Sequence, residues 1–115
     1  MTMIAKLAAA AVLVAGVAAP ALAGASGFAL VNQAGGAVSG IALRRTGGSD
    51  WQSVGGGASD GARTKVSFSD PDCAFDVRAT VAGHGETVWS RVNLCEVSSV
   101  TLHRDASGTT WVDYD

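Results

Sequence analysis

The sequence of 115 residues lacks several features that would assign it to a class of protein. It has no basic excess, because 8 lysines and arginines stand against 10 aspartates and glutamates, and we expect no nucleic-acid partner. No glycine run is followed by the Gly-Lys-Ser/Thr of a phosphate loop, and no Cys-x-x-Cys spacing offers a zinc site. Beyond residue 23 no stretch has the periodicity of an amphipathic helix. These absences leave few arguments for catalysis, and we predict that the protein is not an enzyme.

The N-terminus has the three-part layout of a secretory signal peptide. Lys6 supplies the positive charge, and Leu7–Ala19 is an apolar run of 13 residues, too short for the roughly 20 that a membrane span needs. Pro20 ends any helix, and small residues stand at both peptidase positions of segment 21–23. We therefore predict a signal peptide over 1–23, cleavage before Gly24, and no membrane span after cleavage. An uncleaved N-terminal anchor is the alternative.

Removal of residues 1–23 leaves 92 residues with a net charge of about −3, enough for a single β domain over 24–115. The only two cysteines, Cys73 and Cys95, are expected to pair, because two cysteines in a small exported domain most often do. Such a bridge stabilises the fold by roughly 3 kcal/mol through loop entropy. A pair of metal ligands or two free thiols are the alternatives.

Short runs of alternating apolar and polar residues, separated by turn residues, predict an all-β fold. About six or seven strands are expected, forming a small antiparallel β-sandwich or an open barrel. Trp51–Val54 is expected as a short edge segment and Gly55–Ala62 as a flexible loop. The other expected strands are Phe28–Asn32, Val38–Arg45, Arg63–Ser69, Cys73–Val81, Glu86–Leu94, Val97–His103 and Thr109–Tyr114.

The alternation is clearest in Cys73–Val81, where the odd-numbered residues are apolar and the even-numbered ones are mostly polar. This places the disulfide on the core side and leaves Asp76 and Arg78 as a pair on the wet side. In the next strand both faces carry large apolar groups, so either both are buried or a β-bulge switches sides before Cys95. We expect Trp89 to be buried, whereas a bulge would turn it to solvent.

Three aspartates, Asp70, Asp72 and Asp76, lie close together and are the candidate metal ligands. Calcium collects six to eight oxygens, but the usual D-x-D-x-D-G loop is absent, and Asp before Pro71 is ordinary turn chemistry. We therefore expect no tight metal binding and no cofactor.

The three tryptophans, Trp51, Trp89 and Trp111, are the only groups able to form a surface that stacks on a sugar or a peptide. In a small domain tryptophan more often fills the core or covers a sheet edge. His84 and His103 are expected as solvated surface residues. The segment 57–61 matches the G-x-S-x-G pattern of hydrolases. That motif requires a strand before it and a helix after it, and neither is expected here.

Several short motifs recur in a known group of proteins. The segment 73–78 reads Cys-x-aromatic-Asp-hydrophobic-Arg, and the segment 93–95 reads Asn-Leu-Cys. Upstream, residues 30–32 read Leu-x-Asn before a glycine-bearing turn, and Trp51 follows.

Over about residues 28–103 the chain resembles small exported bacterial β-domain proteins of uncharacterised function, some of which are labelled twin-arginine (Tat) pathway signal proteins. This chain has no twin arginine near its N-terminus, so that label would not describe its export. The resemblance implies a β fold and a Cys73–Cys95 bridge, and it implies no catalytic residue.

These observations predict an exported protein, periplasmic or secreted, that acts without catalysis by binding or as an envelope accessory. The expected partner is an envelope protein or a glycan. A calcium- or carbohydrate-binding module of the adhesion kind is one alternative, and a small hydrolase is the other.

Overall fold

The computed structural model describes residues 24–115, and the predicted signal peptide lies outside the described residues. Within this range the chain forms eight β-strands and no helix, which confirms the all-β fold. A helix able to cross a membrane is accordingly not found among residues 24–115. The strands are β1 (Phe28–Gln33), β2 (Val38–Arg45), β3 (Gln52–Ala58), β4 (Arg63–Val66), β5 (Ala74–Val81), β6 (Gly85–Asn93), β7 (Ser99–Arg104) and β8 (Thr110–Tyr114).

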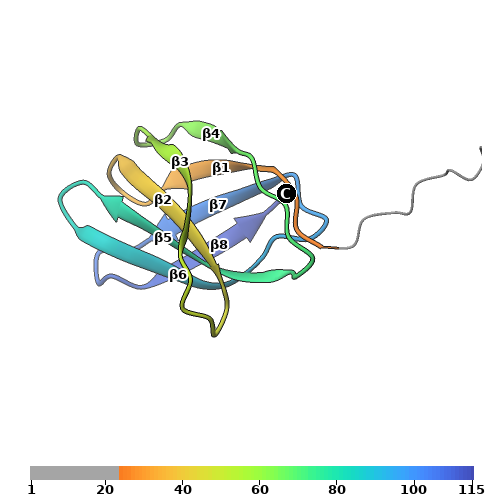
Figure 1. Ribbon diagram of the computed structural model, residues 1–115. Coiled ribbons are helices and arrows are strands. Elements are labelled where there is room, and N and C mark those ends of the chain that lie inside the picture. The colour runs from red at the N-terminus through yellow and green to blue at the C-terminus, as the bar shows by residue number, and fades with distance from the viewer. Residues whose placement is uncertain (1–23) are drawn as a thin grey trace, which may run out of the picture.

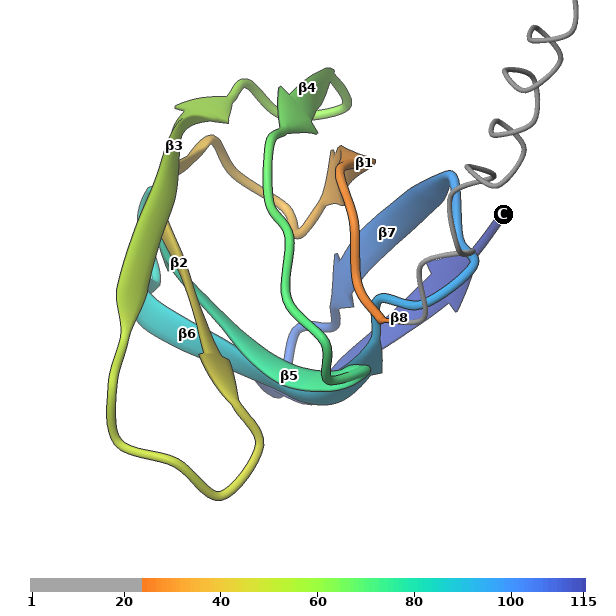
Figure 2. The same cartoon turned by 45° about the vertical axis from the view of Figure 1, so that its right-hand side comes forward.

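The eight strands form two four-stranded sheets that face each other (Figure 1). One sheet has the strand order β4-β1-β7-β8 and the other β3-β2-β5-β6; Figure 2 shows the second sheet as the left and lower wall. Neighbouring strands run antiparallel except for the parallel pair β1–β7. A parallel pair needs a long connection, and here all four strands of the other sheet lie between β1 and β7 in the chain.

The core lies between the sheets and is built from apolar residues at alternate positions. Trp89 is its largest fully buried side chain, with 1% of its surface exposed, so the predicted burial is confirmed. A β-bulge is also present: Trp89 pairs with Val77 and Val92 pairs with Phe75, so two residues of β6 oppose one residue of β5. The bulge therefore keeps both apolar residues of β6 inside, instead of turning Trp89 to solvent.

A buried side chain ties the two sheets together along one side of the sandwich. Asn32 at the end of β1 is fully buried, and its Nδ2 donates to the carbonyl oxygens of Gly36, Ala58 and Ser59 at 2.8, 3.0 and 3.2 Å. Its Oδ1 accepts from the backbone N–H of Ala34 at 2.9 Å. Asn32 thus joins β1 to the end of β3 in the other sheet.

Three contacts close the opposite side, between β6 and the β7–β8 pair. Trp89 Nε1 donates to the carbonyl oxygen of His103 at 2.8 Å. Thr110 Oγ1 donates to the carbonyl oxygen of Val88 at 3.2 Å. The Asn93 backbone N–H donates to the hydroxyl of Tyr114 at 2.8 Å, so side chains rather than a backbone ladder join the sheets here.

The expected loop over Gly55–Ala62 is wrong in its first half, because β3 continues to Ala58 and raises the strand count to eight. Gly55 and Gly57 of β3 pair with β2, and a Cβ at Gly57 would collide with the carbonyl oxygen of Val38. Glycine has low strand propensity, so a strand that needs it for a close backbone approach does not stand out in the sequence.

The Cys73–Cys95 disulfide is present, but its expected position on the core side is wrong. Cys73 is exposed and Cys95 is half-buried. The cause is that β5 begins at Ala74, so the alternation of buried positions does not extend back to Cys73. The bridge joins the chain just before β5 to the chain just after β6, at one end of the sandwich.

Candidate functional site

The sandwich is hollowed at the end where the disulfide lies. The hollow has a volume of about 220 Å³ and is walled by the end of β2, the β2–β3 loop and the segment that leads into β5. Leu43, Phe68 and Phe75 supply its apolar surface, and the two phenylalanine rings meet edge to face with centroids 5.0 Å apart. Charged side chains, among them Arg45 and Asp70, stand beside this apolar surface.

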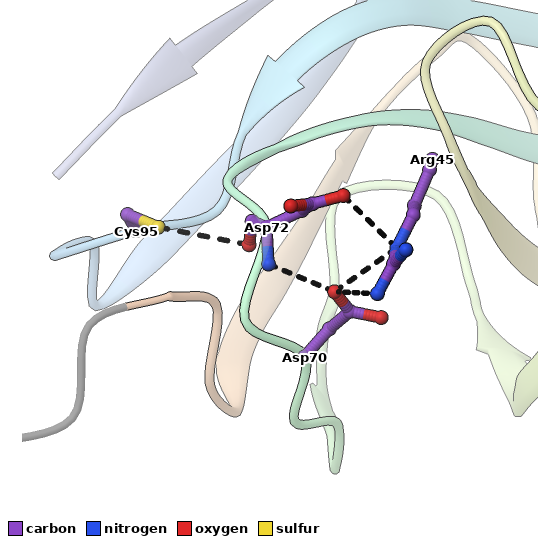
Figure 3. A network of polar contacts seen from close by, with 4 residues as sticks. All are labelled: Arg45, Asp70, Asp72 and Cys95. Atoms are coloured by element: carbon purple, nitrogen blue, oxygen red, sulfur yellow. Dashed lines mark hydrogen bonds and ion pairs between the residues drawn. The ribbon is translucent and has the colours of Figure 1, made fainter.

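Arg45 holds together the rim of the hollow (Figure 3). Its Nε and Nη2 donate to Asp70 Oδ1 at 3.2 and 3.1 Å, and its Nε lies 3.0 Å from Asp72 Oδ2. The backbone N–H of Asp72 also donates to Asp70 Oδ1, at 2.8 Å. This N–H and the guanidinium outweigh the effect of desolvation and hold the pKa of Asp70 below its ordinary value.

The rim network is continuous with the disulfide and with the start of the described chain. The Cys95 sulfur lies 3.8 Å from the carbonyl oxygen of Asp72 (Figure 3). The backbone N–H of Ala25 donates to the carbonyl oxygens of Asp70 and Asp72 at 2.7 and 3.0 Å. The segment that carries the two aspartates is therefore held by the disulfide, by Ala25 and by Arg45.

Trp51 lies on the outer face of the β3-β2-β5-β6 sheet against two arginines. The guanidinium carbons of Arg44 and Arg78 lie 4.5 and 4.3 Å from the centroid of its ring. Arg78 also pairs with Glu86 at 3.2 Å, and Arg44 pairs with Asp76 at 2.9 Å. The half-buried Trp51 ring thus contacts two cations of its own chain.

Asp76 is buried, and its expected surface pairing with Arg78 is wrong. Its side chain is 5% exposed, accepts from Arg44 Nε at 2.9 Å and Thr46 Oγ1 at 3.0 Å, and accepts from the backbone N–H of Arg91 at 3.1 Å. Arg91 is a residue of the β6 bulge and has a φ of 57°, which leaves its N–H outside the regular ladder. Asp76 therefore caps the bulge, a role that strand alternation does not reveal.

Replacement of Asp76 by Asn should destabilise the protein at neutral pH by about 1–3 kcal/mol, because hydrogen bonds to a charged acceptor are lost. Desolvation raises the pKa of Asp76, but the bonds from Arg91, Arg44 and Thr46 outweigh it and leave the pKa below the ordinary 3.8. A carboxyl with a lowered pKa contributes its stability above 3.8 and loses it as the pH falls through the folded-state pKa.

Urea unfolding of wild type and Asp76→Asn at pH 7 and in acid checks this. The difference in unfolding free energy between wild type and Asp76→Asn should be largest at pH 7 and should decrease in acid. The charge-removing variant Asp60→Ser, in an exposed turn, is the control and should differ little from wild type at pH 7. A difference that stays constant down to low pH would contradict the role given to the ionised carboxylate.

Trp111 lies on the outer face of the other sheet, on the edge strand β8, and 45% of its surface is exposed. It pairs with His103 of β7, and their two rings stack with centroids 5.1 Å apart and an interplanar angle of 4°. Asp113, two residues further along the same face, places Oδ2 2.9 Å from His103 Nε2. The aromatic pair is thus fixed in orientation by a neighbouring carboxylate, and His103 is less solvated than expected.

The structure separates the residues that the sequence singled out. Trp51 and Trp111 lie on the outer faces of different sheets, and Trp89 in the core is not accessible to a ligand. Asp70 and Asp72 share Arg45, whereas Asp76 binds Arg44. Within residues 24–115 no three His, Cys, Asp or Glu side chains are grouped so that they could hold a metal ion.

Sequence reasoning missed the hollow and the polar residue Asn32. The hollow combines strand ends with loops, and loops carry no periodic signal; the two phenylalanines on either side of the Ser-Asp-Pro-Asp segment are its only trace in the sequence. His84 is exposed in the β5–β6 turn, as expected.

No protein-family model matches the sequence, and no curated protein matches it. Among solved structures, the NMR structure of a protein from Eubacterium rectale is similar in fold, with a TM-score of 0.56. The two chains are 19% identical over a match that covers 77% of this chain and 86% of the other. At this identity the likeness shows that the two proteins share a fold, the two-sheet β domain described above.

Proposed function

We propose that the protein is an exported binding domain without catalytic activity, which acts in the periplasm or outside the cell. The disulfide supports export, because such bridges persist in oxidising compartments. The exposed Trp111 supports binding, and it is the single observation that carries the proposal. Trp111 remains nearly half exposed in a domain that buries Trp89 completely, so part of its aromatic surface is available to a ligand.

The partner proposed for this surface is a neutral glycan of the cell envelope. The apolar C–H face of a sugar ring stacks on an indole, and its hydroxyls bond to polar side chains close by. Trp111 offers the indole, and Asp113 and the ring of His103 offer polar atoms on the same sheet face. Asp113 is the only charged residue of β8 and is already bonded to His103, so a neutral ligand suits the surface better than an ionic one.

A titration with neutral β-linked oligosaccharides, tetra-N-acetylchitotetraose and cellotetraose, tests this function. Binding should shift the indole N–H resonance of Trp111, and Trp111→Ala should weaken it by about tenfold or more, because the aromatic stacking surface is lost. Val88→Ala, which removes an exposed apolar side chain from the other sheet, is the matched control and should bind like wild type. Equal binding by Trp111→Ala, or no binding of either sugar, would reject the glycan proposal.

Export is checked separately, since protein recovered from the envelope should begin at Gly24 or within two residues of it. A calcium-dependent module would instead show a rise in melting temperature with calcium that Asp72→Ala abolishes. The small hydrolase has less support: Ser59 and Asp60 of the G-x-S-x-G match lie in the exposed turn between β3 and β4.

A further inference from the structure

The hollow at the disulfide end has the size of a site for one small group, and it is independent of the Trp111 surface. Its volume of about 220 Å³ lies below the roughly 300–1,000 Å³ of pockets that enclose whole drug-sized ligands. A single side chain or a short aliphatic molecule fits this space, whereas a folded partner would only cover it.

The wall of the hollow is apolar where it is deepest in the sandwich. Leu43 and Phe75 belong to the core and are almost completely buried, and Phe68 is half-buried against Phe75. Of these three, Phe68 leaves the most apolar surface open, and covering it with a few methylene groups of an aliphatic chain is favourable. The aromatic rings also favour a cation near their faces.

The hollow is lined by two arginines, Arg44 and Arg45, and by two aspartates, Asp50 and Asp70. Arg44 and Arg45 are both bonded to carboxylates, namely those of Asp76, Asp70 and Asp72. Within residues 24–115 the exposed Asp50 on the β2–β3 loop makes no ion pair.

Asp50 and Asp70 approach the hollow from different segments and both line it. Arg45 and Asp72 bond only to Oδ1 of Asp70, and Oδ2 accepts no hydrogen bond from the described residues (Figure 3). Two carboxylates thus have free acceptor oxygens above an apolar wall. An ionised carboxylate with free lone pairs recognises a cationic N–H donor.

We propose that this hollow binds a primary alkylammonium group, with the aliphatic chain against Phe68 and Phe75 and the ammonium between Asp50 and Asp70. The ligand is either a free aliphatic amine or the side chain of a lysine in a peptide, since the recognised chemistry is the same. Anionic ligands are disfavoured, because Arg44 and Arg45, the two cations of the wall, are already paired with aspartates.

NMR titrations of the disulfide-bonded protein with three probes test the site. The probes are cadaverine, Nα-acetyl-lysine N-methylamide, and the norleucine analogue of the latter, which has a similar apolar chain without the ammonium. The two amines should shift amide resonances in segments 43–52 and 68–75, and the norleucine analogue should bind at least about fivefold more weakly. Tighter binding of the lysine derivative would indicate a peptide as the source, and tighter binding of cadaverine a free amine.

Asp50→Asn should weaken binding of both amines by about fivefold without changing the melting temperature, because the exposed Asp50 supports no ion pair in the fold. Asp60→Ser removes a charge from a turn outside the hollow and should leave the affinity unchanged. Equal binding of the norleucine analogue, unchanged affinity in Asp50→Asn, or no shifts in these segments at millimolar amine would each overturn the proposal.

Discussion

Trp89→Ala should lower the free energy of unfolding by about 3–5 kcal/mol, the cost of emptying a large aromatic site in a packed core. The side chain is 1% exposed and is the largest of the fully buried residues. Its side chain lies between the two sheets, and its partner on the neighbouring strand β5 is Val77. The cavity left by the truncation would be enclosed by both sheets, which limits how far the core can collapse into it.

The indole of Trp89 also provides a hydrogen bond between the sheets. Its Nε1 donates to the carbonyl oxygen of His103, which belongs to the other sheet. Trp89→Phe keeps much of the apolar volume and removes this donor, so it should cost less than the alanine variant. The bond itself contributes about 0.5–1.5 kcal/mol.

Urea unfolding of alanine variants at the three tryptophans measures these differences. Trp111→Ala should have a small effect, because its ring is on the surface, and Trp51→Ala should be intermediate, because its ring contacts two guanidinium groups. The expected order of effects, Trp89, Trp51, Trp111, follows the burial of the three rings. A Trp89→Ala variant as stable as wild type would show that the assigned core is wrong.

The strands that sequence could predict are those with one buried and one wet face. Val38–Arg45 is found with the expected bounds, and in β5 the alternating residues from Phe75 to Val81 fill the core. The β5–β6 hairpin turn also follows from its glycines, since Gly83 and Gly85 both adopt a positive φ. Alternating burial and turn chemistry depend on residues that are neighbours in the sequence, so one sequence is enough to predict them.

The features that the sequence could not predict depend on partners distant in the chain. Glycine-rich β3 is a strand only because β2 lies beside it, and the parallel β1–β7 pair joins segments about 70 residues apart. Asp76 has the spacing of a surface residue, yet a bulge in β6 gives it a buried N–H to accept from. Tertiary hydrogen bonding overrides strand alternation at this position.

The candidate sites follow the same division. The burial of Trp89 is predicted from its strand, but the exposure of Trp111 depends on the packing of the two sheets. The hollow could not be anticipated, because its wall combines residues of β2, β3 and β5 with two loops, and these residues have no common period.

Loss of the Cys73–Cys95 disulfide should lower the free energy of unfolding by about 2–5 kcal/mol. The bridge spans 22 residues, for which loop entropy in the unfolded chain gives about 3 kcal/mol. Because Cys73 is exposed and Cys95 is half-buried, replacing both with serine creates no core cavity. The effect should therefore arise mainly in the unfolded chain, with a local contribution where Ala25 is bridged to Cys95.

This origin gives the disulfide prediction a sharp test. The double variant Cys73→Ser/Cys95→Ser and the wild type with its disulfide reduced and its thiols unmodified should lose similar amounts of stability. Both lack the cross-link, and neither loses core packing. Amide shifts of core residues such as Val77 and Leu102 should stay close to those of the oxidised protein, whereas those around Asp72 should move, because the Cys95 sulfur contacts its carbonyl. Two alkylatable thiols in unreduced protein, or a double-serine variant as stable as wild type, would contradict the stabilising role of the bridge.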